Sequence, residues 1–351
     1  MKERVLLLFG GVSSEHDISL LSAASVLRHI PAEDYDVLPV GITKDGRWYL
    51  YDGGADQLPG DEWLKGTIRP AMLSPDRGDR TLLVFDGDTV IRTPIDVCFP
   101  VLHGKNGEDG TMQGLLEIAG IPYVGCGCLS SAMCMDKAVT NTMADAAGVP
   151  QAKWLSVKRR AYAADPDAYI DRCIRELALP IFVKPANAGS SVGITKARDR
   201  EELAHAFDVA FAEDSKVVCE ACVVGREIEC AVLGNDAPVA SALGEIRPCH
   251  EFYDFEAKYE DDSDLIIPAK LPADVTQAVQ DAALTIYRAM DCRGLSRVDF
   301  FVTADGGVMF NEINTIPGFT SISMYPKLFA ESGVAYGELI RRLLALAKEP
   351  R

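Results

Sequence analysis

The chain has 351 residues, of which 48% are hydrophobic and 25% charged, as expected for a water-soluble globular protein with two or three subdomains. Its formal net charge of −17 argues against a nucleic-acid-binding surface, which needs a basic patch. No apolar run approaches the roughly 20 residues of a membrane span, and the short run after Arg4 does not fit a secretory signal. We therefore expect a cytoplasmic protein that binds neither membrane nor nucleic acid.

The first stretch predicts an α/β domain. Val5–Phe9 is a continuous apolar run, as in a buried parallel strand, and Gly10 then turns the chain. Ser14–Asp17 matches a capping box and predicts a helix directly after it. Glu15 has two interpretations: it matches the dipole of that helix, or it is a ligand-binding carboxylate at a strand's C-terminal end.

A glycine-rich loop lies near the end of this first region. Residues 35–100 predict further short strands, and the loop 104–110 follows the last of them. A helix over Thr111–Ala119 opens from this loop, so its exposed N–H groups would form an anion site.

The next region combines a helix, a strand and a flexible loop. Ser130 or Ser131 is expected to cap a helix that reaches Ala147 and contains Lys137, which by default is a surface charge. The strand Pro180–Pro185 carries Lys184. It leads into ANAGSSVGI, residues 186–194, which either folds over phosphates or forms a plain turn, and which lacks the order of a Walker A motif.

The ten cysteines favour buried reduced thiols over disulfides. Most of them fall inside apolar or strand-like stretches. Cys219 and Cys222 form a CxxC pair within a strand-like segment, but no second pair follows at the spacing of a zinc site.

The acidic, aromatic segment His250–Asp264 is typical of a mobile cover over a site.

A hairpin near the C-terminus carries the most informative pattern. Asp305-Gly306 between two strand-like runs predicts a two-residue turn. That turn places Asp299 opposite Glu312 and Arg297 opposite Asn314 on one face, and it places the apolar pairs Val298 with Ile313 and Val302 with Met309 on the other face.

Opposed carboxylates repel each other, so the hairpin face needs a compensating positive charge. Divalent cations such as magnesium would supply it, and because magnesium usually shares phosphate oxygens, the pattern then implies a nucleotide. The alternative is a solvated face that Arg297 neutralises. The hairpin alone favours neither interpretation.

In addition, the order of motifs along the whole chain resembles the D-alanine–D-alanine ligases of the ATP-grasp superfamily. The matching segments are LFGGVSSEHDISLLSA, HGKNGEDGTMQGLLEIAGIPYVG, SSAMCMDK, VKPANAGSSVG, EFYDFEAKY, RVDFF and NEINTIPGFTSISMYP. Each match is weak alone, but their joint occurrence in one order is specific. The resemblance favours the metal interpretation of the hairpin.

The resemblance implies an α/β (α+β) ATP-grasp fold with three subdomains. These are a pre-ATP-grasp domain with a parallel sheet (1–125) that binds the first D-alanine, a central domain (126–219) with the phosphate loop, and a C-terminal domain (220–351) with a lid at about 245–264 and the metal site. The implied reaction joins two D-alanines through a D-alanyl phosphate, using ATP and two Mg²⁺ (or Mn²⁺), for peptidoglycan synthesis. A cytoplasmic homodimer is implied as well.

The resemblance also assigns roles to individual residues. The metal ligands would be Asp299, Glu312 and Asn314. ATP would be bound by Lys137, Lys184, Ser190, Ser191, Glu220, Ala221, Cys222, Val223, Glu227 and Lys258. Catalysis would involve Glu15, Ser190, Tyr259, Arg297 and the Gly318 N–H, and the amino acids would be bound by His103, Ser323 and Met324.

The identity of the second amino acid depends on few positions. Two residues favour D-alanine. Tyr259 is present in the lid, and Met324 stands where ligases that form D-alanyl-D-lactate or D-alanyl-D-serine often carry arginine. A D-alanine–D-serine ligase is the alternative. Ala188 stands where some members of the family have a glutamate.

Overall fold

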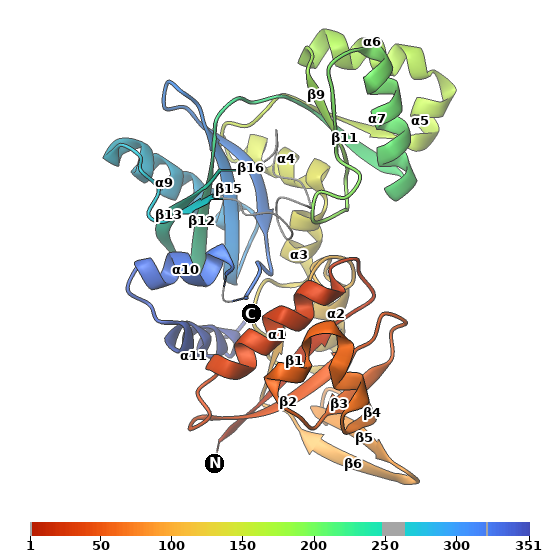
Figure 1. The fold of residues 1–351 in the computed structure, drawn as a ribbon, viewed down its shortest axis with the longest axis vertical. Coiled ribbons are helices and arrows are strands. Elements are labelled where there is room, and N and C mark those ends of the chain that lie inside the picture. Colours follow the sequence, from red (N-terminus) through yellow and green to blue (C-terminus); the bar gives the residue numbers. More distant parts are fainter. Residues whose placement is uncertain (1, 248–263, 321) are drawn as a thin grey trace.

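The structure, a computed structural model, describes residues 2–247, 264–320 and 322–351, and it contains three sheets with their covering helices (Figure 1). The strands of the N-terminal sheet are β1 (Glu3–Gly10), β2 (Tyr35–Ile42), β3 (Trp48–Tyr51), β4 (Ile68–Leu73), β5 (Thr81–Asp86), β6 (Thr89–Pro94) and β7 (Val97–Pro100). Their order is β6-β5-β4-β3-β2-β1-β7, in which β1 is parallel to β2 and β7, while the other neighbours are antiparallel.

Strand β1 is buried on both faces, as its continuous apolar run predicts. Leu6 and Leu8 face the core that includes Leu116 of helix α2 (Thr111–Ala119), whereas Leu7 and Phe9 face the core of helix α1 (His16–His29). The predicted capping box before α1 is wrong, because no side chain caps this helix and Glu15 occupies the N-cap position. The carboxylate of Glu15 is therefore available for other contacts.

The central sheet is four-stranded and entirely antiparallel. Its strands are β8 (Trp154–Lys158), β9 (Ile181–Pro185), β10 (Thr195–Ala197) and β11 (Lys216–Ala221), in the order β10-β9-β11-β8. Three helices share a core with it, namely α5 (Arg159–Ala164), α6 (Pro166–Leu177) and α7 (Arg200–Glu213). Figure 1 shows this unit at the upper right, in green.

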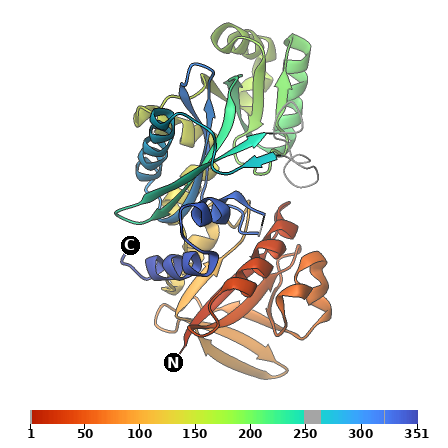
Figure 2. The same cartoon turned by 60° about the vertical axis from the view of Figure 1, so that its left-hand side comes forward.

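The third sheet has five antiparallel strands. They are β12 (Arg226–Gly234), β13 (Val239–Arg247), β14 (Asp264–Ile266), β15 (Gly294–Val302) and β16 (Val308–Asn314), in the order β14-β13-β12-β15-β16. Helix α9 (Ala273–Ala289) packs on this sheet, and α10 (Met324–Glu331) and α11 (Tyr336–Ala347) join its core to that of α1. Figure 2 shows α10 and α11, in blue, between this sheet and the N-terminal one.

The helix predicted from Ser130 or Ser131 to Ala147 is wrong as a single element. Two helices, α3 (Cys128–Met135) and α4 (Lys137–Ala146), stand in its place. Asp136 separates them, because its side chain accepts hydrogen bonds from the N–H groups of Ala138 and Val139 and so caps α4. This break makes Lys137 the first residue of α4, whereas the prediction placed it within a longer helix.

The hairpin β15–β16 confirms the pairing that matters for the site. Arg297 lies opposite Asn314, Val298 opposite Ile313, and Asp299 opposite Glu312. Nearer the turn the predicted register is wrong, because Val302 pairs with Val308 and not with Met309.

The hairpin differs from the predicted register by one residue at its turn, and a single bulge further along cancels that difference. The Thr303 N–H donates to the Gly307 carbonyl and leaves Ala304–Gly306 as a three-residue loop, with Gly306 at φ 87°. Asn311 is then the extra residue of a bulge in β16, beyond which Asp299 and Glu312 face each other. The prediction thus reached the correct pairs from a wrong turn.

The nine cysteines within the described residues are free thiols, and most of them are buried, as predicted. The CxxC residues Cys219 and Cys222 are among them and do not pair with each other. Within the described residues, no helix is both long and apolar enough to span a membrane.

Candidate active site

A cavity of about 720 Å³ lies where the three sheets meet. Its wall includes Glu15 from the N-terminal part, Lys184 from β9 and Asp299 from β15. Segments from all three parts of the chain therefore contribute side chains to one site.

Most residues that the sequence singled out lie on the wall of this cavity. They are Glu15, His103, Lys137, Lys184, Ser190, Ser191, Glu220, Ala221, Val223, Glu227, Arg297, Asp299, Glu312, Asn314, Gly318, Ser323 and Met324. Cys222 is not part of the wall, and its N–H donates to the carbonyl of Pro180. Lys258 and Tyr259, with most of the predicted lid, lie outside the described residues.

The carboxylate of Asp299 is the centre of the β15–β16 face. Its two oxygens accept from Arg297 Nε at 2.8 Å and from Arg297 Nη2 at 2.7 Å, and Asn314 Nδ2 donates to it at 3.1 Å. Arg297 Nε also lies 3.1 Å from Glu229 Oε2. Burial lowers the pKa of Arg297, but Asp299 and Glu229 outweigh burial and hold it well above its ordinary value.

The alternative of a solvated hairpin face does not fit, because Asp299 is only 8% exposed. Arg297 does neutralise part of the charge, as that alternative assumed, but Glu312 lies directly opposite Asp299 on the same face. Two carboxylates and the amide oxygen of Asn314 on one cavity wall are the oxygen donors that hard divalent cations prefer. The donor set therefore fits magnesium or manganese.

Lys184 is held at the cavity wall by an ion pair. Its Nζ lies 2.6 Å from Glu220 Oε2, and both side chains are largely buried. Asn141 Nδ2 donates to the other oxygen of Glu220 at 3.0 Å. Burial lowers the pKa of Lys184, but Glu220, Glu312 and Glu227 together raise it above its ordinary value, so this lysine is positively charged.

The second lysine, Lys137, begins helix α4 beside the loop 186–194. Its N–H donates to the carbonyl of Ala186 at 2.9 Å, and its Nζ donates to the carbonyl of Ala188 at 2.7 Å. The helix start and the loop are thus joined by two bonds from one residue. The break at Asp136 makes this possible, because a continuous helix would use the Lys137 N–H internally.

The loop 186–194 has an unusual backbone. Ser190 and Ser191 adopt φ 48° and 58°, a left-handed conformation that is uncommon for residues other than glycine. A side chain at Gly189 would place its Cβ 2.6 Å from Glu15 Oε2, so this glycine permits the loop to lie against that carboxylate. Such strained backbones gather at sites that clamp ligands.

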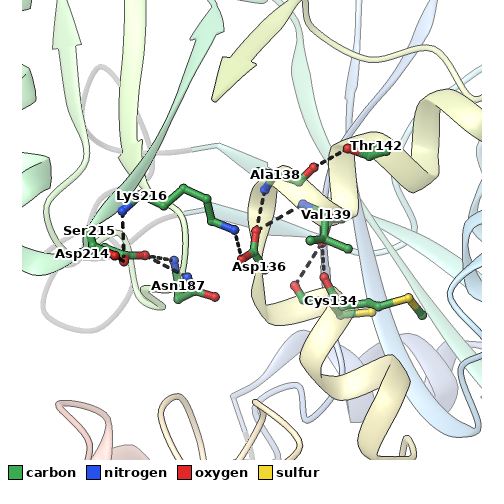
Figure 3. A network of polar contacts seen from close by, with 11 residues as sticks. Cys134, Asp136, Ala138, Val139, Thr142, Asn187, Asp214, Ser215 and Lys216 are labelled. Atoms are coloured by element: carbon green, nitrogen blue, oxygen red, sulfur yellow. Dashed lines mark hydrogen bonds and ion pairs between the residues drawn. The ribbon is translucent and has the colours of Figure 1, made fainter. Parts of the chain in front are cut away.

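The base of the loop is fixed by two acidic residues (Figure 3). Asp214 accepts from the N–H of Asn187 at 2.9 Å and from its Nδ2 at 2.8 Å. Asp136, while it caps α4, also pairs with Lys216 of β11. These contacts tie the start of the loop and the start of α4 to the same strand end, as Figure 3 shows.

Glu15 lies between two loops from distant parts of the chain. Ser190 Oγ donates to Glu15 Oε1, and the Glu15 N–H donates to Ser13 Oγ at 3.1 Å. A Cβ at Gly104, which has φ +70°, would lie 2.3 Å from Glu15 Oε2. The carboxylate of Glu15 thus lines the cavity and contacts Ser190, and its ligand-binding interpretation stays a prediction.

His103 is buried and its two ring nitrogens are both engaged by the protein. Nδ1 lies 3.0 Å from the carbonyl of Ile316, and Nε2 lies 3.0 Å from Ser22 Oγ. Burial lowers the pKa of His103, although Glu15 opposes this shift. A neutral ring that donates from Nδ1 and accepts at Nε2 satisfies both contacts.

Gly318, Thr320 and Ser323 lie close together at the cavity wall. Ser323 Oγ accepts from the Thr320 N–H at 3.1 Å and lies 2.7 Å from Thr320 Oγ1. A Cβ at Gly318 would lie 2.8 Å from Ser323 Oγ, so a side chain there would displace this hydroxyl. Met324 begins α10. A Cβ added at Gly244 would lie only 2.1 Å from the Cε of Met324.

Sequence reasoning missed several residues that shape the site. They are Glu108, Asp136, Asn141, Asp214, Lys216 and Glu229. Most of them contact site residues that are distant in sequence, so a local pattern does not identify them. Asp136 is the exception, because an Asp in front of Lys137 is a preferred N-cap residue.

Comparisons with known proteins agree over nearly the whole chain. The family model described as D-ala D-ala ligase N-terminus matches residues 4–126, and the one described as D-ala D-ala ligase C-terminus matches residues 143–345. The D-alanine--D-alanine ligase of Caldicellulosiruptor bescii is 53% identical over 99% of this chain and 96% of the relative. That of Acetivibrio thermocellus is 49% identical with the same coverage.

Solved structures give the same result. The VanG D-Ala:D-Ser ligase from Enterococcus faecalis superposes with a TM-score of 0.90 at 39% identity, over 99% of this chain and 100% of that chain. The D-alanine-D-alanine ligase from Coxiella burnetii superposes with a TM-score of 0.86 at 37% identity, over 99% of this chain and 94% of that chain. With its ATP-grasp fold, the chain therefore belongs to the D-alanine–D-alanine ligase family of ATP-dependent ligases.

Proposed function

We propose that this enzyme joins two D-alanines to D-alanyl-D-alanine with ATP, for peptidoglycan precursor synthesis. The observation that carries the proposal is the arrangement of one cavity, in which the acidic pair Asp299 and Glu312, two lysines and the carboxylate of Glu15 line the wall. Such a cavity suits a polyphosphate bound through cations beside an amino acid bound through its ammonium group.

The nucleotide would occupy the side formed by the central sheet. Lys137 and Lys184 would bind its phosphates together with the N–H groups and hydroxyls of Ser190 and Ser191. The end of β11 and the start of β12, with Glu220, Ala221, Val223 and Glu227, would line the adenine and ribose. Lys258 from the lid segment would complete this side.

Asp299, Glu312 and Asn314 would hold two Mg²⁺ or Mn²⁺ ions. When bound, these ions neutralise charge on the phosphoryl group that is transferred. Arg297, held against Asp299 by two hydrogen bonds, would remain oriented toward the oxyanion that forms when the second amine attacks. The Gly318 N–H would donate to the same oxyanion.

The first D-alanine would lie near Glu15, whose carboxylate would accept from its ammonium group. Ser190, which already donates to Glu15, and Tyr259 of the lid would complete this contact chain. The carboxylate of the first D-alanine would then attack the γ-phosphate, break its bond to the β-phosphate oxygen and release ADP, which leaves a D-alanyl phosphate. The second D-alanine would be bound by its carboxylate through Ser323 and the Met324 backbone, and its amine would displace the phosphate.

A D-alanine–D-serine ligase is the second candidate, favoured by the likeness to the VanG D-Ala:D-Ser ligase. The 53% identity to a D-alanine--D-alanine ligase and the presence of Met324 in place of an arginine support D-alanine.

We also propose a cytoplasmic homodimer with three subdomains, each built around one of the sheets. The boundary between the second and third would follow β11, which pairs as far as Ala221.

Phosphate release and product analysis test this proposal. The purified enzyme is given magnesium-ATP with D-alanine alone, and then with D-alanine plus D-serine or D-lactate. We expect phosphate release with D-alanine alone and D-alanyl-D-alanine as the main product by mass spectrometry in all mixtures. Turnover that requires D-serine would favour the second candidate, and no D-alanine-dependent phosphate release would contradict both.

A further inference from the structure

The loop between β7 and α2 holds one residue of a distant segment at both of its backbone groups. Glu108 Oε1 accepts from the N–H of Ile316 at 3.0 Å, and His103 Nδ1 lies 3.0 Å from the carbonyl of the same Ile316. The other oxygen of Glu108 accepts from the N–H of Gly104 at 2.7 Å. One carboxylate thus joins its own loop to a segment 208 residues away in sequence.

A third contact holds the same segment three residues further on. The N–H of Phe319 donates to Ser22 Oγ at 3.3 Å, and Ser22 Oγ also contacts His103 Nε2. Glu108, His103 and Ser22 therefore bind the segment 316–319 at three points. We call this set of contacts the Ile316 clamp.

The clamp lies between residues for which the reaction requires an accurate position. Ile316 is two residues after Asn314, at the end of β16, and two residues before Gly318. On the other side, Gly104, which donates to Glu108, is in close approach to Glu15. The clamp thus connects the wall that carries Glu15 to the wall that carries Gly318.

The electrostatic environment of Glu108 is unusual for a carboxylate. Burial and the nearby charge of Glu15 raise the pKa of Glu108 to about 8, against the lowering effects of the two backbone N–H groups and of Arg297. His103, the remaining titratable group at the clamp, is buried and has a lowered pKa. A carboxyl kept here against this cost indicates a task other than stability.

We infer that Glu108 is a positioning residue, which through the Ile316 clamp sets the distance between the first amino acid at Glu15 and the oxyanion donor at Gly318. The inference rests on the proposed function, because it assigns Glu15 and Gly318 to the two reacting amino acids. Glu108 itself does not contact the substrates in this account. Its ionised form accepts both N–H groups, whereas protonation removes one acceptor and loosens the clamp.

Steady-state kinetics of Glu108→Gln test this inference. An amide keeps the size of the side chain but offers only one acceptor oxygen to the two N–H groups. At pH 9, where Glu108 of the wild type is ionised, we expect kcat to fall about 10- to 100-fold, the size of effect that a small misplacement of reacting groups produces, while the KM for ATP changes less than twofold. The kcat of the wild type should rise between pH 7 and 9, and that of the variant should not.

Asp109→Asn is the matched control, because among the described residues Asp109 bonds only within its own loop, to Asn106 and Thr111. It should leave kcat within about threefold of the wild type, as do most substitutions away from key contacts. Ser22→Ala, which removes the contact to Phe319 by a different residue, should lower kcat without raising the KM for ATP. It also serves if Glu108→Gln does not fold.

Hydrogen exchange separates this inference from the proposed function, because it requires no turnover. At pH 9, where Glu108 is ionised, amides of Ile316 and Phe319 should exchange at least tenfold faster in Glu108→Gln than in the wild type, and the Asp109→Asn rate should match the wild type. Unchanged exchange, or a kcat equal to that of the wild type at every pH, would overturn the clamp. A wild type without turnover, in which the exchange rates of the variants still differ as expected, would instead overturn the proposed function and leave the clamp intact.

Discussion

The two sides of the cavity are built in different ways. The carboxylates Asp299 and Glu312 stand on paired strands, where the backbone ladder sets their positions. The loop 186–194 has no ladder, and it is held at its base by Asp214 and Lys137 and at its tip by Glu15. The strand side is therefore rigid before any ligand binds, whereas the loop side depends on a few side chains.

This difference suits the two tasks that we propose. A cation site requires fixed donor positions, which a sheet provides through its register. A loop that closes over phosphates must admit and release them, so it is drawn from a less stable part of the fold. Substitutions on the strand side should therefore affect stability or chemistry strongly, and those at the loop base should affect nucleotide affinity mildly.

Asp299→Asn is expected to have the largest effect, because it leaves the largely buried Arg297 without its main partner. Breaking one half of a buried ion pair costs about 3–5 kcal/mol of unfolding free energy. Urea denaturation of the variant should show a loss in this range, together with loss of turnover. A stability equal to that of the wild type would show that the pair is not buried as described.

Glu312→Gln should separate chemistry from stability on the same strand pair. We expect turnover to fall at least about 100-fold at saturating magnesium, because a carboxylate ligand becomes neutral, while the melting temperature stays close to that of the wild type. Asp305→Asn, an exposed residue at the tip of the same hairpin and outside the cavity wall, is the control. Retained activity in Glu312→Gln would remove the metal assignment.

The stability of the wild type should depend on pH through Glu108. Its pKa is raised from 4.5 to about 8, so the folded protein binds the extra proton between these values. This contribution to the unfolding free energy is fully present below pH 4.5 and is lost as pH rises to 8, at up to about 1.4 kcal/mol per pH unit. Glu108→Gln should remove that part of the slope in denaturation curves at pH 5–8, and an unchanged slope would contradict this.

Asp214→Asn tests the loop side and should have the smallest effect. The neutral side chain weakens the two bonds to Asn187, which are charge-assisted, at a cost of about 1–2 kcal/mol. We expect the KM for ATP to rise several-fold with kcat nearly unchanged, and Asp208→Asn, exposed on α7, to match the wild type. A large loss of kcat would show that the loop is as rigid as the strands.

The sequence predicts the strand side better than the loop side, for physical reasons. Period-2 alternation and a turn signal were enough to pair Asp299 with Glu312, even though the three-residue turn and the bulge at Asn311 were both missed. These errors cancelled because each displaces the register by one whole residue, and they do so in opposite directions.

Long-range contacts were beyond local reasoning. Nothing near Glu108 in sequence indicates that it bonds to Ile316, and nothing near Asp214 indicates its bonds to Asn187. Family resemblance supplied most of the predicted site residues on the cavity wall, but the side chains that support them follow from the packing of the three parts of the chain. Their roles, like those of the residues that they support, remain predictions for experiment.

The most direct test of the account is the position of a cation in a crystal grown with a non-hydrolysable ATP analogue and Mn²⁺. Anomalous scattering identifies manganese without reference to the protein density. We predict anomalous peaks within coordination distance of Asp299, Glu312 and Asn314, with the phosphates toward Lys137 and Lys184. Peaks elsewhere in the cavity, with the two carboxylates still facing each other and bound to no ion, would contradict the account.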